Sequence, residues 1–232
     1  MDHDCLVLTN GGAEAIALVA GDAPAGAVAE PEFSLYRRHL ATVSADAPRW
    51  RSNPSNPLGT LAGPDEGARV WDEAFYPLAT GRWTRGDERT WRLGSLTKLW
   101  ACPGLRLGYA IAPDTDAAAR LRARQPQWAV NGLVAALVPA LLAATDLAGW
   151  QHAIEVARRR FAAELGSLGF AVSATDANWV LVDGHDLRTR LAPHGVVVRD
   201  LASFGLDGRF RVALPRPDEL DRVLTAFAQV AR

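Results

Sequence analysis

Short apolar strands alternate with helices over roughly the first half of the chain, and this alternation restricts the fold more than any other feature. Val70-Trp71, Thr90–Leu93 and Leu105–Ala112 have the composition and length of buried strands. Ala13–Ala20 and Thr115–Ala123 read as helices between and after such strands. Alternation of this kind favours an α/β fold with a mostly parallel sheet covered by helices.

The second half changes character. Val130–Ala144 is mostly apolar, so we expect a buried helix, and Leu147–Leu165 reads as a long amphipathic helix that connects two parts of the molecule. We therefore expect a large domain over residues 1–144 and a small C-terminal α/β domain over 145–232. Its elements are expected to be strands at Phe170–Val172, Trp179–Val182, Val196–Val198 and Phe210–Ala213, with helices near Leu187–Leu191 and from Pro217 onward.

Composition excludes several classes of function. The chain is 49% hydrophobic with a net charge of −1 and has no basic tail, so we expect neither nucleic acid nor membrane as a partner. No apolar run is long enough to cross a bilayer, and the first residues lack the pattern of a signal peptide. Cys5 and Cys102 are far apart, which suits a reducing, cytoplasmic setting without disulfides. The five histidines have no metal-ligand spacing, so no metal is expected.

One lysine stands out among the 25 basic residues. Lys98, in Ser95-Leu96-Thr97-Lys98, is the single lysine, and Arg106 follows in Pro103-Gly104-Leu105-Arg106-Leu107-Gly108-Tyr109. A bias toward arginine should remove lysine wherever only charge matters. Arginine cannot replace an amine that must lose its proton and attack a carbonyl. Lys98 is therefore a candidate nucleophile, although a leftover surface lysine has the same appearance.

Two loops carry groups suited to binding. Gly11-Gly12, in a strand-to-helix turn, would present free amides to a phosphate, although the spacing matches neither the Rossmann nor the P-loop pattern. Asn53–Gly59 contains two prolines that stiffen an extended loop and leave two asparagine amides free to donate. A tight turn and a surface turn are the respective structural alternatives.

A carboxylate follows the strand Val70-Trp71. Asp72, the first of the acidic pair Asp72-Glu73, would need a cationic partner if it were buried. A protonated pyridine nitrogen is one such partner. A solvated acidic pair is the structural alternative.

These elements occur in a fixed order, and in that order the chain resembles the class I/II aminotransferases of pyridoxal-phosphate fold type I. The order is the glycine turn, Pro31-Glu32-Phe33, the asparagine–proline loop, the acidic strand end, the lysine and the arginine. The resemblance extends over nearly the whole chain. It implies pyridoxal 5'-phosphate as the cofactor.

The resemblance also implies a role for each cofactor residue. Lys98 would be the Schiff-base lysine, and Asp72 would hold the ring nitrogen protonated, so these two are the implied catalytic residues. Phe33 would stack on the ring, and Asn56 would donate to its phenolic oxygen. The residues implied to bind the cofactor phosphate are Gly12, Ala13, Ser95 and Arg106.

Two further arginines are implied to bind substrate, Arg211 its carboxylate and Arg199 its phosphate. Within the family the nearest resemblance is to the threonine-phosphate decarboxylases of cobalamin biosynthesis, which convert L-threonine O-3-phosphate to (R)-1-aminopropan-2-ol O-phosphate. Phe75, where many aminotransferases have tyrosine, supports that resemblance. A histidinol-phosphate-type aminotransferase is the alternative, and an inactive scaffold or binding homologue is another.

The chain departs from the family pattern near its start. Family members begin well before the glycine turn, so by resemblance the chain lacks the N-terminal segment that completes the small domain and part of the substrate pocket. A missing helix would expose an apolar patch. We therefore expect either a partner subunit that covers it, as in the family's homodimers, an upstream start, or a shortened homologue that has lost activity.

Overall fold

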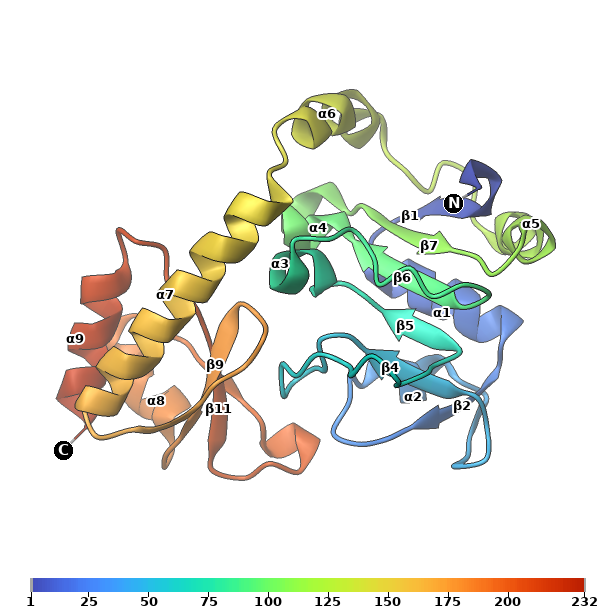
Figure 1. The fold of residues 1–232 in the computed structure, drawn as a ribbon. Coiled ribbons are helices and arrows are strands. Elements are labelled where there is room, and N and C mark those ends of the chain that lie inside the picture. Colours follow the sequence, from blue (N-terminus) through green and yellow to red (C-terminus); the bar gives the residue numbers. More distant parts are fainter. Residues whose placement is uncertain (1, 232) are drawn as a thin grey trace.

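The chain builds two separate sheets, joined by one long helix (Figure 1). The computed structural model describes residues 2–231. The first sheet has seven strands in the order β1-β7-β6-β5-β4-β2-β3. Its strands are β1 (Leu6–Thr9), β2 (Ala25–Val28), β3 (Thr42–Val43), β4 (Arg49–Ser52), β5 (Val70–Asp72), β6 (Trp91–Ser95) and β7 (Gly108–Ile111).

The sheet is mostly parallel, as expected. Strands β3, β2, β4, β5 and β6 run parallel to one another, while β7 is antiparallel to both β6 and β1. Parallel strands buried on both faces need continuous apolar stretches, and β6 is buried along its whole length. Because β4, β5 and β6 are parallel, their carboxyl ends lie at one edge. Ser52, Asp72 and Ser95 therefore come to the same side of the sheet.

Helices cover both faces of this sheet. On one face α1 (Gly12–Asp22), α2 (Leu35–His39) and α5 (Thr115–Arg124) enclose the larger apolar core. On the other face lie α3 (Tyr76–Thr80), α4 (Leu96–Leu99) and the start of α7 (Leu147–Ser167). Asp114 begins α5 as an N-cap, since its side chain accepts a hydrogen bond from the Ala117 amide at 2.7 Å.

The second sheet is small and wholly antiparallel, in the order β10-β11-β9-β8. Helices α7, α8 (Leu187–Leu191) and α9 (Leu220–Val230) pack around one core, in which Phe161, Phe227 and Val180 are fully buried. Figure 1 shows α7 reaching from the first sheet to the second. The strands are β8 (Ala171–Ser173), β9 (Trp179–Asp183), β10 (Arg199–Asp200) and β11 (Arg209–Ala213).

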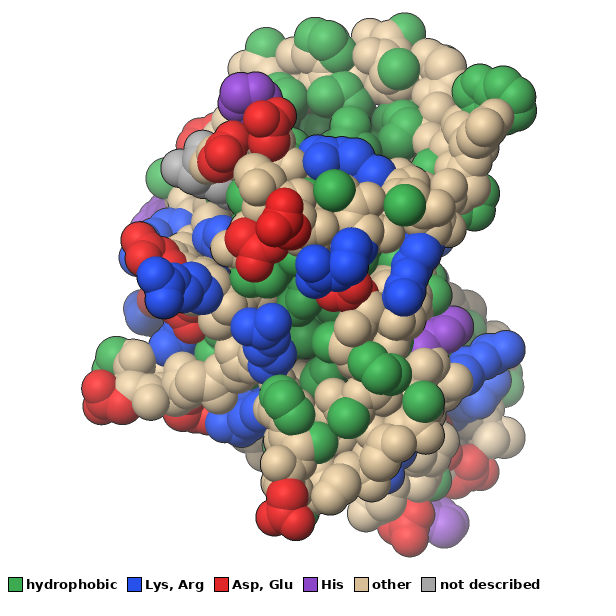
Figure 2. Space-filling view, turned by 90° about the vertical axis from the view of Figure 1, so that its right-hand side faces the viewer, with side chains coloured by type: hydrophobic (Ala, Val, Ile, Leu, Met, Phe, Trp, Pro, Cys, Tyr) green, Lys and Arg blue, Asp and Glu red, His purple; other side chains and the backbone are tan. Residues whose placement is uncertain are grey.

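The helix expected to be buried is not buried. Helix α6 (Gly132–Ala143) has one buried residue, Val134, while Leu133 is 63% exposed and Leu142 is 45% exposed. The prediction was wrong because an apolar composition indicates that a helix requires packing partners but does not supply them. Among residues 2–231, other segments pack against only one side of α6. Hydrophobic side chains accordingly occupy the top of the molecule in Figure 2, the region where Figure 1 places α6.

Helices α6 and α7 meet at a sharp bend. Within residues 2–231 no single helix is long and apolar enough to span a bilayer. The two helices pass that test of length and composition only as a pair, and they are bent by 79° at the break between them.

Other element predictions also need correction. Val196–Val198 was expected to be a strand, but strand pairing begins only at Arg199. Val196 and Val198 are buried without pairing to a neighbouring strand, and Val197 is exposed. The sequence interpretation missed β3, β4, α3 and α4. Strand β4 reads Arg-Trp-Arg-Ser, which has no apolar pattern of a central strand. It is stable there because Trp50 is buried and the Arg51 guanidinium pairs with Glu66.

Candidate active site

A pocket of about 250 Å³ lies at the carboxyl edge of the first sheet. The strand ends described above bring Asp72 and Ser95 to it, and the short helix α4 adds Lys98. The sequence-predicted residues that line it are Gly12, Ala13, Phe33, Asp72, Ser95, Lys98 and Arg106, which come from segments up to 94 positions apart in the chain.

One end of the pocket is a helix N-terminus faced by a guanidinium group. Gly11 has a φ of 79° and precedes α1, whose first amides, those of Gly12 and Ala13, have no acceptor inside the helix. A Cβ atom at Gly11 would lie 2.5 Å from Nη2 of Arg106, so glycine leaves the space that the guanidinium occupies. Backbone amides, helix dipole and guanidinium together suit an anion such as a phosphate.

The other end of the pocket holds the Asp72 carboxylate. Its Oδ2 accepts a hydrogen bond from the Tyr36 hydroxyl at 2.8 Å, and its Oδ1 accepts one from the Ala74 amide at 3.0 Å. Burial and the nearby charges of Asp72 and Glu32 raise the pKa of Tyr36 well above its ordinary value, so the phenol remains a donor. Both hydrogen bonds fix the orientation of the Asp72 carboxyl group at the pocket.

Lys98 lies at the mouth of the pocket beside a series of aromatic rings. Its Nζ is 5.1 Å from the centre of the Phe75 ring, and the Phe75 and Trp179 rings pack edge to face at 4.9 Å. The Arg211 guanidinium in turn lies 5.1 Å from the Trp179 ring. These contacts connect the lysine on α4 to the arginine on the second sheet.

Asn56 does not line the pocket. Its side-chain Oδ1 accepts a hydrogen bond from Nη1 of Arg211 at 2.7 Å, and its backbone N–H donates to the Ser52 hydroxyl at 2.8 Å. Asn56 therefore links the asparagine–proline loop to the second sheet. The side-chain Nδ2–H₂ group of Asn56 retains its capacity to donate.

Arg199 and Arg211 are neighbours, since they are direct partners in the β10–β11 ladder. Arg199 is exposed and donates to the Ser203 hydroxyl at 3.3 Å, while Arg211 is half-buried. Burial, and then the charge of Arg199, lower the pKa of Arg211 below its ordinary value. Two adjacent guanidinium groups, one of them desolvated, form a site for anionic groups.

Four cations of this region share one property. Within residues 2–231, no carboxylate lies within 4.0 Å of the charged nitrogens of Lys98, Arg106, Arg199 or Arg211. Cations without a carboxylate partner favour an anionic ligand.

Sequence reasoning missed Tyr36, Ser52 and Trp179. Tyr36 has no role in the sequence analysis above, yet its hydroxyl donates a hydrogen bond to Asp72. Trp179 was assigned only to a strand, yet its Nε1 donates to the Pro57 carbonyl at 3.0 Å and its ring supports Arg211. A buried polar tip on an aromatic side chain was the available signal in both cases, since such tips find partners.

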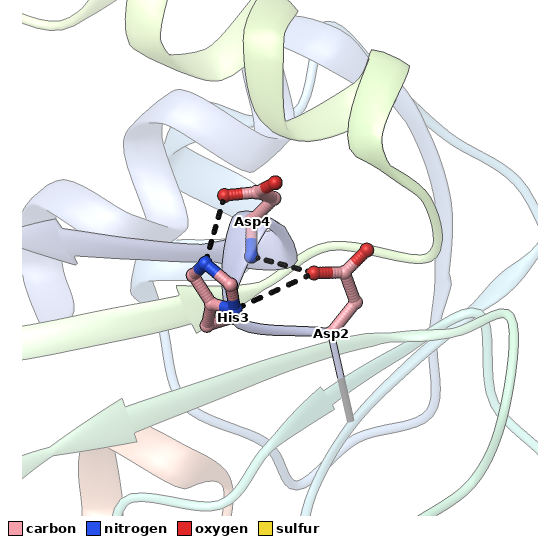
Figure 3. A group of neighbouring side chains, drawn as sticks. All are labelled: Asp2, His3 and Asp4. Carbon is pink, nitrogen blue, oxygen red and sulfur yellow. Dashed lines mark hydrogen bonds and ion pairs between the residues drawn. The ribbon is translucent and has the colours of Figure 1, made fainter.

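Larger hollows and one polar cluster lie elsewhere on the described part of the chain. A groove of about 370 Å³ between α7 and the β11–α9 connection is lined almost entirely by apolar side chains. Asp2, His3 and Asp4 gather at the first turn (Figure 3), with ligand atoms within 4.8 Å of one another. All three are exposed, and Asp2 serves as the cap of that turn. The pocket at the sheet edge combines a nucleophile, an acid and anion-binding groups.

Comparison with known proteins identifies the class to which this arrangement belongs. The model of the family "Aminotransferase class I and II" matches residues 50–227. Threonine-phosphate decarboxylase of Salmonella typhimurium is 34% identical over 69% of this chain and 48% of its own length. Histidinol-phosphate aminotransferase of Streptomyces avermitilis is 30% identical over 78% of this chain and 54% of its own length. The chain thus spans about half the length of these two relatives.

The fold gives the same result. Histidinol-phosphate aminotransferase of Clostridium acetobutylicum superimposes with a TM-score of 0.86 over 97% of this chain and 83% of that one, at 24% identity. The fold is therefore that of the pyridoxal-phosphate enzymes of fold type I. The chain belongs to the class I and II aminotransferase family, whose members use pyridoxal 5'-phosphate.

Proposed function

We propose that this protein is a pyridoxal-phosphate enzyme that decarboxylates L-threonine O-3-phosphate to (R)-1-aminopropan-2-ol O-phosphate, a reaction of cobalamin biosynthesis. One observation carries the proposal. The chain's single lysine lies at a pocket that has a carboxylate at one end and a glycine turn with an arginine at the other. Random placement of a surface lysine would give no such surroundings.

The residues present fit the cofactor. The amides that begin α1 would hold its phosphate together with the Arg106 guanidinium, which packs against Gly11 in the space that a Cβ there would fill. Phe33 would form a wall beside the ring, and Asp72 would hold its nitrogen protonated. When bound, the cofactor supplies an aldehyde for a covalent bond to an amine and a ring that withdraws electrons from that bond.

Arg211 and Arg199 would bind the substrate. The Trp179 ring and the Asn56 amide hold Arg211 from two sides, so its guanidinium is oriented before a carboxylate arrives. Arg199 beside it would take the substrate phosphate. By fixing the carboxylate and the phosphate, these two arginines would decide which bond at the substrate's alpha carbon is placed to break, and the proposal is that they present the bond to the carboxylate.

The identity to a threonine-phosphate decarboxylase and the phenylalanine at position 75 support decarboxylation. The alternative is transamination of histidinol phosphate, which several relatives at about 30% identity favour. Both substrates carry a phosphate, so the arginine pair suits either. A catalytically inactive binding homologue is a third possibility that only turnover excludes.

Carbon dioxide release separates these functions. We expect the purified protein with added pyridoxal 5'-phosphate to release carbon dioxide from L-threonine O-3-phosphate. Lys98→Ala should lose this activity together with the cofactor's absorbance band, which in the wild type vanishes when borohydride reduces the bond to the lysine. Glutamate formed from histidinol phosphate and 2-oxoglutarate, or its reverse, would identify an aminotransferase instead. Cofactor bound in place without turnover of either substrate would identify a binding homologue.

We infer the same general organisation as in the family: a large cofactor domain over 1–144, a small domain over 145–232, and a cytoplasmic homodimer. The two separate sheets support the division. The exposed apolar face of α6 supports a protein partner rather than a free surface. Sedimentation of the purified protein measures the subunit number directly.

A further inference from the structure

Glu32 is a buried carboxyl group to which the proposed function assigns no role. It is 5% exposed, and within residues 2–231 no cation lies within ion-pair distance of it. Its Oε1 accepts from the Ser52 amide at 3.0 Å, and its Oε2 accepts from the Ser52 hydroxyl at 2.5 Å. A buried acid without a counterion is costly, so the site around it must depend on its contacts.

Those contacts lead to two parts of the pocket. The Ser52 hydroxyl that donates to Glu32 also accepts from the Asn56 amide at 2.8 Å, so Glu32 holds the loop that carries Asn56. The backbone N–H of Phe33 donates to Oε2 of Glu32 at 3.2 Å. Phe33 is the residue that would form a wall beside the cofactor ring. Ser52 and Asp72 are direct partners on neighbouring strands, so Glu32 and the Asp72 carboxylate lie on the same side of β4 and β5.

The charged and titratable neighbours of Glu32 come from each element around it. They are Asp72 on β5, Tyr36 on α2, Arg51 on β4 and Glu30 in the same turn, whose carboxylate accepts from the Glu32 amide. Burial raises the pKa of Glu32 to about 7, hydrogen bonds from Ser52 and Phe33 oppose that rise, and the Asp72 charge adds to it. Glu32 is thus neither fully protonated nor fully ionised near neutral pH.

We propose that Glu32 is a positioning residue and the second anion of the cofactor site, which acts through Ser52 on the Asn56 loop and, together with Asp72, favours a protonated cofactor ring. The inference rests on the proposed use of pyridoxal 5'-phosphate. A cation held by Asp72 stabilises a second nearby carboxylate, so cofactor binding should favour ionised Glu32. By linkage, affinity for the cofactor should rise as pH increases through the range in which Glu32 ionises.

Glu73 provides a matched control. It is 0% exposed and burial likewise raises its pKa to about 7, but its carboxylate accepts from the Arg85 amide and does not line the pocket. Glu73→Gln and Glu32→Gln therefore remove equally buried acids. Of these two acids, Glu32 is hydrogen-bonded to a residue that lines the pocket, Phe33, whereas Glu73 is hydrogen-bonded to Arg85, which does not line it.

The experiment measures the dissociation constant of pyridoxal 5'-phosphate at pH 6, 7 and 8 for the wild type, Glu32→Gln, Glu73→Gln and Ser52→Ala, together with the thermal midpoints of the four apoproteins. At pH 8 we expect Glu32→Gln to bind about fivefold more weakly than wild type, the order of effect of one partly screened charge. The increase in affinity from pH 6 to 8 should be smaller in this variant. Glu73→Gln should match the wild type in both respects, and Ser52→Ala should weaken binding like Glu32→Gln.

The outcomes are distinct. Equal affinities and equal pH profiles for Glu32→Gln and Glu73→Gln overturn the inference while leaving the proposed function intact, and so does a lowered apoprotein midpoint with an unchanged affinity profile. If Glu32→Gln does not fold, Ser52→Ala decides: affinity like that of the wild type rejects the role. A wild-type protein that binds no cofactor rejects both the proposed function and this inference.

Discussion

At position 108 only glycine has room. The backbone of β7 passes so close to the glycine turn that a Cβ there would lie 2.5 Å from the Gly11 carbonyl carbon and 2.6 Å from the Gly12 nitrogen. Backbone atoms cannot move aside as the end of a side chain can. Gly108 thereby keeps the start of α1 against the strand that follows Arg106, which holds the two anion-binding groups together.

Gly108→Ala should therefore lower the free energy of unfolding by about 1–3 kcal/mol, the range for overpacking a close contact. Urea unfolding of the apoprotein measures it. Gly104→Ala, in the same Pro103–Tyr109 segment, is the control because nothing lies within 4 Å of a Cβ there, and we expect a change within about 0.5 kcal/mol. Equal effects at the two positions would mean that the turn and β7 are not in close contact.

The residue types in the sequence predicted which side chains line the pocket better than they predicted the hydrogen-bond partner of each side chain. Lys98, Asp72 and Arg106 were singled out from the sequence and lie in one pocket. Asn56 was assigned to the cofactor, yet its carbonyl oxygen contacts Arg211. Spacing along a chain shows which residue types a segment offers, but the partner of a side chain depends on which distant segment folds against it.

Among the elements, α6 differs most from its expectation. A single face of this helix contacts the core, where Val134 packs beside Leu107 and Leu147 and Val138 is partly buried, while Leu133 and Leu142 are exposed. Its sequence is apolar on every side, so no face is marked as the inner one. Tertiary contacts alone decided which residue became buried.

Substitutions in α6 test this orientation. Val134→Ala should cost about 1–3 kcal/mol because Val134 is 1% exposed, whereas Leu133→Ala should change the free energy of unfolding by less than about 0.5 kcal/mol because Leu133 is 63% exposed. Denaturant unfolding at low protein concentration measures both. A comparable cost at the two positions would show that another surface covers the exposed side in solution.

For the whole molecule, the decisive feature is that two sheets meet beside one pocket. Arg211 on the second sheet contacts Asn56 from the first part of the chain, and Trp179 contacts Phe75 across the same boundary. Two acids, Glu32 and Glu73, are buried inside the molecule. Glu73 has one carboxylate oxygen without a hydrogen-bond partner, and Nε of the buried Arg92 also lacks one.

These buried acids predict how stability depends on pH. Burial raises the pKa of Glu73 from 4.5 to about 7, so between these values the folded state holds a proton that the unfolded state has lost. The stabilisation is complete below about pH 4.5 and is lost as pH rises to about 7, an effect on the order of 3 kcal/mol for this carboxyl. Asp22, whose pKa is lowered by Arg120, acts only below its ordinary value of 3.8.

Glu73→Gln should therefore flatten the decline in apoprotein stability between pH 5 and pH 8, with the variant gaining on the wild type as pH rises. Urea unfolding at several pH values measures the two slopes. Parallel pH profiles for the variant and the wild type would contradict the protonated state of Glu73. Glu32 contributes in the same direction, so some decline should remain in the variant.

The sequence by itself determined the type of fold and the residue types of the site, because strand–helix alternation and the order of glycine, asparagine, aspartate, lysine and arginine are local properties of the chain. Tertiary structure decided the partners: Tyr36 on Asp72, Glu32 on Ser52, Arg211 on Asn56 and the exposed side of α6. The physical reason is that hydrogen bonding and burial depend on segments 20 to 155 positions apart, whose approach no local pattern encodes.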